Sequence, residues 1–176
     1  MSKVKNILFI MCDQLRADYL SCTGHPRLET PNIDALAQKG ILFPRAYCQS
    51  PVCGGSRMSF YTGRYNFTHG ASWNGVPLNI GEKTLGDYLR PLDYRVALVG
   101  KTHMVADIDG MNRLNIDQQS IEGILASECG FEPYERDDGL WGWSDDFIPK
   151  DLAYNNYLNS LGYKGKNPWH DFANSH

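Results

Sequence analysis

A cysteine and an arginine stand four residues apart in the segment SPVCGGSRMSFYTGRY, residues 50–65. A proline and two glycines surround the cysteine, so we expect a helix to begin near Cys53. The backbone N–H groups and the dipole of a helix start favour an anion, either a thiolate or a bound oxyanion. Arg57 would follow one turn later on the same face, where its charge can reach that anion. Two interpretations stay open at this stage, a buried packed thiol and a reactive centre.

Two more groups of polar residues follow predicted strands. Asp13 and Gln14 end the apolar run VKNILFIM, and Lys101 and His103 end the run YRVALVG. The carboxyl ends of strands in an open α/β sheet meet where such folds bind ligands. The side-chain oxygens of Asp13 and Gln14 suit a hard cation such as Ca²⁺, Mg²⁺ or Mn²⁺. Lys101 and His103 would add a positive charge and a titratable imidazole at the same edge.

The elements that position these groups follow from periodicity and from helix caps. Continuous apolar runs predict strands buried on both faces, and Thr30, Pro31 and Gly40 mark the cap, first turn and end of a helix. The predicted elements are a strand over Val4–Asp13, a helix over Glu29–Gly40, a short strand ILFPRAYC, a helix EKTLGDYLRPL that Pro91 ends, a strand over Tyr94–Lys101 and a helix over Asp151–Leu161. The alternation predicts an α/β fold, a mostly parallel mixed sheet between helices. Periodicity weakens after Met104, and Cys129–Lys150 is predicted to be loop.

Length and composition are those of one globular domain. The chain has 176 residues, 42% of them hydrophobic, and a net charge of −3. Lys and Arg are scattered, which argues against nucleic-acid binding. The longest apolar run, Ile7–Met11, is far shorter than the roughly 20 residues of a membrane span, and no signal-peptide cleavage site follows it. We therefore expect a cytoplasmic protein that does not bind membranes.

The five cysteines show neither a C-x-x-C pair nor a zinc spacing. An odd number in a cytoplasmic chain argues against a disulfide framework. We expect most of them to be small buried side chains, as thiols of this kind usually are.

Three segments together resemble a known family. NILFIMCDQLRADYL, TPNIDALAQKGILFPRAYCQSPVCGGSRMSFYTGRY and YRVALVGKTHM are similar, in order and spacing, to the amino-terminal third of the formylglycine sulfatases. These enzymes belong to the alkaline-phosphatase-like superfamily, and the resemblance is to the branch with phosphonate monoester hydrolases and choline-sulfatase-like enzymes. It covers about residues 4–105. It implies that residues 1–105 are the amino-terminal part of the catalytic α/β domain, and residues 106–176 its loop-rich, helical, truncated continuation.

The resemblance implies a role for each candidate residue. Cys53 would be oxidised by a formylglycine-generating enzyme to an aldehyde, whose hydrate attacks the ester and whose second hydroxyl expels the oxyanion. Asp13, Gln14 and the modified Cys53 would bind one divalent metal ion, calcium or manganese, with magnesium as an alternative. Arg57 would steady the formylglycine, and Lys101 and His103 would contact the transferred group. Asn74 matches a substrate-side position of the phosphonate hydrolase branch.

The implied activity is metal-dependent hydrolysis of sulfate esters, with phosphonate monoesters or phosphodiesters as further substrates. Gly55 departs from the family's modification motif, which usually has Pro or Ala there, and the second metal-ligand pair of the family has no match. Two alternatives therefore remain, a hydrolase that uses the unmodified thiol and an inactive fragment that only binds a partner. Besides the small anionic ester and the modifying enzyme, we expect the remainder of the same polypeptide as a partner, and a homo-oligomer as a further option.

Overall fold

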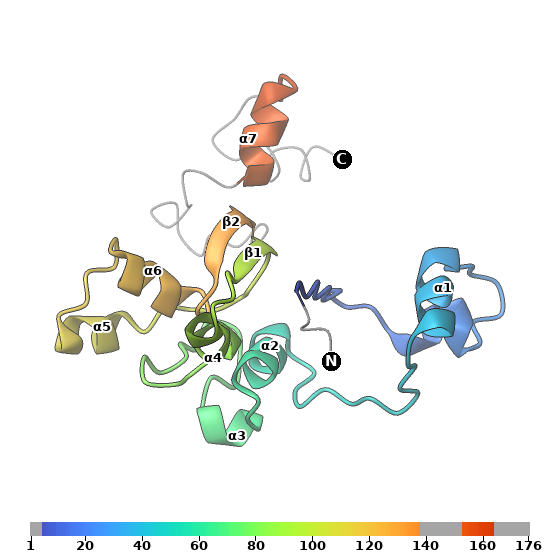
Figure 1. Cartoon of the computed structure of the whole chain (residues 1–176), viewed down its shortest axis with the longest axis horizontal. Helices are drawn as coiled ribbons and strands as arrows, with labels where there is room; N and C mark the ends of the chain where they lie inside the picture. Colours follow the sequence, from blue (N-terminus) through green and yellow to red (C-terminus); the bar gives the residue numbers. More distant parts are fainter. Residues whose placement is uncertain (1–4, 138–152, 164–176) are drawn as a thin grey trace. The chain divides into compact units, whose positions relative to one another are not determined.

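The computed structural model describes residues 5–137 and 153–163 (Figure 1). The chain folds as two compact units, Met1–Cys48 and Gln49–His176. The α-helices (α), 3₁₀-helices (η) and strands (β) are, in chain order, η1 Ala17–Tyr19, η2 Ser21–Thr23, α1 Pro31–Lys39, α2 Cys53–Thr62, α3 Asn66–His69, α4 Leu85–Leu89, η3 Arg90–Leu92, β1 Ala97–Gly100, α5 Ile108–Leu114, α6 Ile121–Ser127, β2 Glu132–Arg136 and α7 Ala153–Ser160. Within the described ranges, no helix has the length and hydropathy of a membrane span.

The first unit contains α1, which confirms the helix predicted at residues 29–40. Pro31 is its first residue, where the fixed φ of proline suits the helix and its missing N–H costs nothing. Asp34 on α1 accepts hydrogen bonds from Ser21 Oγ at 2.6 Å and from the Cys22 N–H at 2.9 Å. The hydrogen bond from Ser21 is the largest cause that lowers the pKa of this carboxyl group. Asp34 thereby joins α1 to η2.

Among the residues that the structure describes, it contradicts two strands that the sequence predicts in the first unit. Residues 5–13 and 41–48 form no strand, and Ile7 and Leu8 are 65% and 85% exposed. An inner strand needs hydrogen-bonded neighbours and helices over both of its faces. The described elements of this unit are η1, η2 and α1, so it supplies no strand to pair with.

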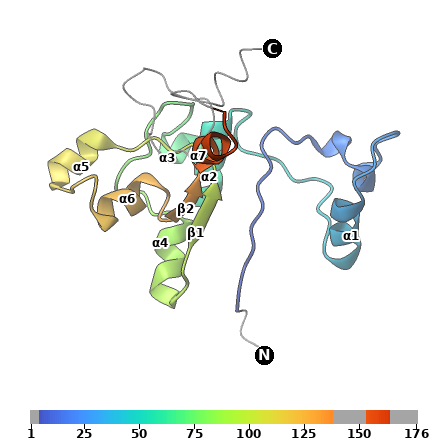
Figure 2. The same cartoon turned by 90° about the horizontal axis from the view of Figure 1, so that it is seen from above.

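The second unit contains a parallel pair of strands, which confirms the predicted α/β class. β1 and β2 lie side by side with Ala97 opposite Glu132 and Gly100 opposite Arg136 (Figures 1 and 2). α5 and α6 form the connection between the two strands, as a parallel pair requires. β1 confirms the strand predicted at residues 94–101.

β2 corrects the prediction of loop after Cys129. Its sequence EPYER has no apolar alternation and contains Pro133, which cannot donate to a ladder. The ladder accommodates the strand through an irregularity between Leu98 and Val99. Pairing with β1, rather than local preference, therefore makes this segment a strand.

Two other predicted helices are confirmed. α4 and η3 together cover the second predicted helix, and α4 begins with a capping box in which Thr84 and Asp87 exchange hydrogen bonds. α7 is the helix predicted at residues 151–161. Trp141 and Trp143 lie outside the described residues.

The core of the second unit includes residues of α2, of α5 and of the segment before β2. Its buried apolar side chains include Met58, Leu78, Met111 and Phe131, and the Tyr61 and Phe131 rings meet edge to face at 5.3 Å. The cysteines are less buried than predicted. Cys129 is buried, Cys22 and Cys53 are half-buried, and Cys12 and Cys48 are exposed to solvent. The packed core therefore holds the helix that carries the predicted nucleophile.

Candidate active site

Cys53 is the first residue of α2, as the sequence predicts. Val52 before it has the extended backbone of an N-cap residue, and its carbonyl accepts the Ser56 N–H at 2.9 Å. The Cys53 side chain is half-buried. The thiol therefore stands at the positive end of a ten-residue helix with part of its surface open.

Asn74 lies directly against this helix start. Its side-chain oxygen accepts a hydrogen bond from the Gly54 N–H at 2.8 Å and lies 3.4 Å from Cys53 Sγ. The Asn74 amide oxygen caps the helix in place of an N-cap side chain, because the Val52 side chain cannot accept a hydrogen bond. The structure thus brings Asn74 together with Cys53, two of the residues that the sequence singles out. Whether Asn74 contacts substrate stays a prediction.

Gly55 is closely surrounded in the folded chain. A Cβ atom there would lie 2.9 Å from both the Ser72 carbonyl oxygen and Asn66 Oδ1, and 3.1 Å from Ser50 Oγ. Contacts under 3.0 Å to backbone require a neighbour to move. The packing around α2 therefore favours glycine at this position, because an added Cβ would require the Ser72 carbonyl to move.

Arg57 follows one turn after Cys53 and is buried, with 6% of its surface exposed. Its Nη1 donates to the carbonyl oxygen of Lys101 at 2.7 Å. A hydrogen bond with a charged donor is about twice as strong as a neutral one. Arg57 therefore links the helix that carries Cys53 to the segment after β1.

Lys101 and His103 follow the last residue of β1, as predicted. Both side chains are half-buried. His103 has a φ of 58°, in the left-handed region, and Gly100 has a φ of 90°. A non-glycine residue in that region is uncommon and persists where the surroundings enforce it. The backbone turn at His103 is therefore a specified feature of this segment.

Asp13 and Gln14 belong to the first unit, whereas the other candidate residues belong to the second. They form an exposed bend in which Gln14 has a φ of 54°. Their carboxylate and amide oxygens are the donor types that a hard cation takes. No cluster of three or more His, Cys, Asp or Glu side chains able to hold a metal occurs among residues 5–137 and 153–163. Asp13 and Gln14 fit such a cation as two of the six or more ligands that it needs, and their role stays a prediction.

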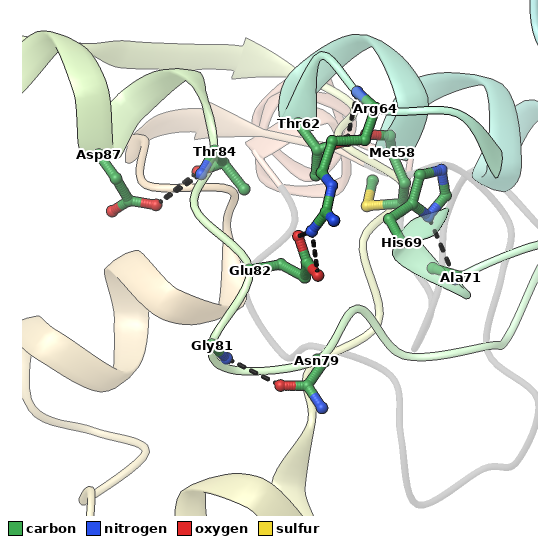
Figure 3. A network of polar contacts seen from close by, with 10 residues as sticks. All are labelled: Met58, Thr62, Arg64, His69, Ala71, Asn79, Gly81, Glu82, Thr84 and Asp87. Atoms are coloured by element: carbon green, nitrogen blue, oxygen red, sulfur yellow. Dashed lines mark hydrogen bonds and ion pairs between the residues drawn. The ribbon is translucent and has the colours of Figure 1, made fainter. Parts of the chain in front are cut away.

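A buried pair that the sequence did not single out, Ser59 of α2 and His69 of α3, lies toward the far end of α2. His69 Nδ1 accepts the Ala71 N–H at 3.2 Å (Figure 3). The neutral ring therefore carries its proton on Nε2, which donates to Ser59 Oγ at 2.9 Å. Burial lowers the pKa of His69. Beside it, Arg64 donates to both carboxylate oxygens of Glu82 at 2.6 Å (Figure 3). These contacts fix α2 against α3 and the following loop.

A second unpredicted network surrounds the residue between Lys101 and His103. Thr102 is fully buried, and its hydroxyl donates to Glu128 Oε2 at 2.9 Å. Glu128 also binds Arg136 Nε at 2.6 Å. A buried acid and a half-buried base 26 residues or more from Thr102 give no periodic signal in a sequence, so only the fold reveals them.

Comparison with known proteins agrees with the resemblance of the motifs. The sequence model of the family described as Sulfatase matches residues 5–113. The chain is 30% identical over 115 residues to N-acetylglucosamine-6-O-sulfatase of Bacteroides thetaiotaomicron, covering 65% of this chain and 21% of that protein. It is 32% identical over 161 residues to the multifunctional alkaline phosphatase superfamily protein PehA of Trinickia caryophylli, covering 78% and 31%.

Solved structures give the same picture. The phosphonate monoester hydrolase of Agrobacterium radiobacter superposes with a TM-score of 0.65 and 29% identity, over 88% of this chain and 28% of that one. The phosphonate monoester hydrolase SpPMH from Silicibacter pomeroyi gives a TM-score of 0.68 and 27% identity, over 92% and 30%. This chain therefore spans between about a fifth and a third of the length of the proteins it matches.

Proposed function

This chain belongs to the sulfatase family, and we propose that it forms part of a hydrolase of sulfate esters or phosphonate monoesters. One observation carries the proposal: Cys53 begins α2 against the Asn74 amide, one turn before an arginine that binds the Lys101 backbone. Relatives named for both chemistries support the substrate class, an ester of a tetrahedral anion.

The proposed nucleophile is the hydrate of an aldehyde that a separate oxidising enzyme makes from Cys53. One hydroxyl of the hydrate attacks sulfur or phosphorus and gives up its proton, while the bond to the alcohol breaks and the alcohol leaves with a proton. The second hydroxyl then loses its proton, the aldehyde C=O forms again, and the C–O bond to the held oxyanion breaks. A thiol has no second group for that exit. This reason favours the modified residue over the unmodified thiol.

The surroundings of Cys53 supply the electrostatics. The N-terminus of α2 favours negative charge by about 0.3–1 kcal/mol at an exposed position. Arg57 brings a fixed positive charge within one turn, in a buried place where water screens little. Lys101 and His103 would contact the oxygens on which charge develops, because their segment is tied to α2 through Arg57.

We assign Asp13 and Gln14 to a divalent cation, whose charge would polarise the ester oxygens. Their oxygen donors favour calcium, manganese or magnesium over zinc. The cation would need further ligands besides these two, and the modified Cys53 is the predicted third. A cytoplasmic location and a homo-oligomer stay predictions.

Mass spectrometry of the tryptic peptide from Ala46 to Arg57 tests the proposal directly. Protein produced with a formylglycine-generating enzyme should give the aldehyde peptide, which is lighter than the thiol peptide, and no aldehyde should form in Cys53→Ala. The protein that contains the whole chain, prepared in the same way, should hydrolyse an aryl sulfate or an aryl phosphonate monoester. The opposite outcome is a protein that contains only the thiol, hydrolyses the ester, and loses this activity when an alkylating agent is added. That result would replace this proposal by the thiol hydrolase.

A further inference from the structure

The residues on both sides of His103 are held by one corner of the chain, Glu128 and Cys129. The Thr102 hydroxyl donates a hydrogen bond to Glu128 Oε2 at 2.9 Å. Met104 accepts the Cys129 N–H on its sulfur at 3.1 Å. The Met104 N–H in turn donates to Thr102 Oγ1 at 3.3 Å. Two consecutive residues thus fix both neighbours of His103.

This corner is itself held rigidly. Glu128 is 6% exposed, and Arg136 at the end of β2 binds its other carboxylate oxygen at 2.6 Å. Arg136 is also the ladder partner of Gly100, the residue before Lys101. A buried carboxylate that keeps a charged partner and a hydroxyl donor has little freedom to move, because either loss leaves an unsatisfied charge. The strand pair and the corner therefore fix the Lys101–His103 segment from two sides.

The backbone at His103 explains why such support is needed. Its φ of 58° is a conformation that a non-glycine residue leaves unless its neighbours hold it there. Fully buried Thr102 has a hydroxyl that both donates and accepts within this network. Without that hydroxyl, the segment could relax and turn Lys101 and His103 away from their present directions.

We propose that Glu128, through Thr102 and with Arg136, is a positioning residue that sets the orientation of Lys101 and His103. The inference rests on the proposed function, in which those two side chains contact the transferred group. Glu128 and Arg136 lie beyond residues 5–113, the part that the family model matches. Neither touches the reacting atoms in this proposal, so both act through the Thr102 hydroxyl and the backbone.

The test compares two buried threonines in the whole protein that contains this chain. Thr102→Val removes the hydroxyl that binds Glu128. Thr84→Val is the matched control, because Thr84 is 2% exposed and its hydroxyl binds the Asp87 carboxylate at 2.8 Å. We expect both to lower the melting temperature. Thr102→Val alone should lower kcat on an aryl sulfate or aryl phosphonate by about 10- to 100-fold with KM little changed, since small misplacements cost about that much.

Thr102→Ser restores the hydroxyl and should return kcat to within a few-fold of the starting protein. A second readout needs no activity: the ring resonances of His103 in an NMR spectrum should shift in Thr102→Val and stay in place in Thr84→Val. If the starting protein hydrolyses neither ester, the proposed function fails and the resonances decide this inference alone. Unmoved His103 resonances in Thr102→Val, or equal losses of kcat in both valine variants, would overturn it.

Discussion

Arg57 donates a hydrogen bond from Nη1 to the carbonyl oxygen of Lys101 at 2.7 Å, across 44 residues of sequence. The bond joins the helix that begins with Cys53 to the segment that carries Lys101 and His103. A change at either end should therefore alter the other, in stability and in chemistry.

Replacement of Arg57 should destabilise the fold. In Arg57→Gln the shorter side chain leaves the Lys101 carbonyl without its charged donor, and we expect the free energy of unfolding to fall by about 1.5–3 kcal/mol. Urea unfolding followed by circular dichroism measures it. Arg16→Gln is the control, because Arg16 forms an exposed ion pair with Asp18 that water screens. Equal effects of the two substitutions would contradict the buried link.

Substitutions of Asn74 should separate stability from chemistry. Asn74→Ala removes the acceptor of the Gly54 N–H and should cost about 1 kcal/mol, as the loss of a helix cap does. Asn74→Asp keeps an acceptor and places a negative charge at the helix start, so the fold should keep its stability. The same charge beside Cys53 should repel an anionic ester and lower kcat/KM by at least about 10-fold. Steady-state kinetics that leave Asn74→Asp as active as the starting protein would remove Asn74 from the substrate side.

Gly55→Ala should stabilise the helix locally and yet destabilise the protein. Alanine gains about 1 kcal/mol over glycine in a helix. The added Cβ would lie 2.9 Å from the Ser72 carbonyl oxygen, and such overpacking costs about 1–3 kcal/mol. We expect a lower melting temperature together with more aldehyde at Cys53, since alanine restores the family's modification motif. Ser56→Ala, at a half-buried neighbouring position, is the control; a rise in melting temperature for Gly55→Ala would show that the walls yield.

His69 should make stability depend on pH. Burial lowers its pKa in the folded state, an effect that the nearby Arg64 charge adds to and the Glu82 charge opposes. The unfolded chain therefore binds the proton more readily. The contribution is complete above the unfolded pKa of about 6.5 and is lost as the pH falls below it towards the folded pKa.

Urea unfolding at pH values of about 7.5 and about 5.5, on either side of the ordinary histidine pKa, measures the effect. The fall in unfolding free energy between these pH values should shrink in His69→Asn. Ser59→Ala is the matched comparison, because it removes the partner of His69 Nε2 and keeps the buried ring. It should lower stability at both pH values while the dependence remains. If the pH dependence of the unfolding free energy is unchanged in His69→Asn, groups other than His69 cause it.

Local rules determined several features of this protein. Pro31 at the first position of α1, the proline and glycines around Cys53, and the capping residues of α4 set helix boundaries within a few residues of their own chain. The sequence also determined which side chains could do chemistry, because Cys53 begins a helix with Arg57 one turn later, and the Lys101–His103 pair follows a strand.

Tertiary structure decided what those side chains touch. The sequence could not show that EPYER pairs with β1, that Asn74 covers the start of α2, or that Glu128 holds Thr102, because each contact joins residues 20 or more positions apart. It wrongly made residues 5–13 a buried strand, since hydrophobicity predicts burial but cannot provide the partner that a strand requires. Local propensities act over one turn or one strand, whereas hydrogen-bond partners and packing walls come from the path of the whole chain.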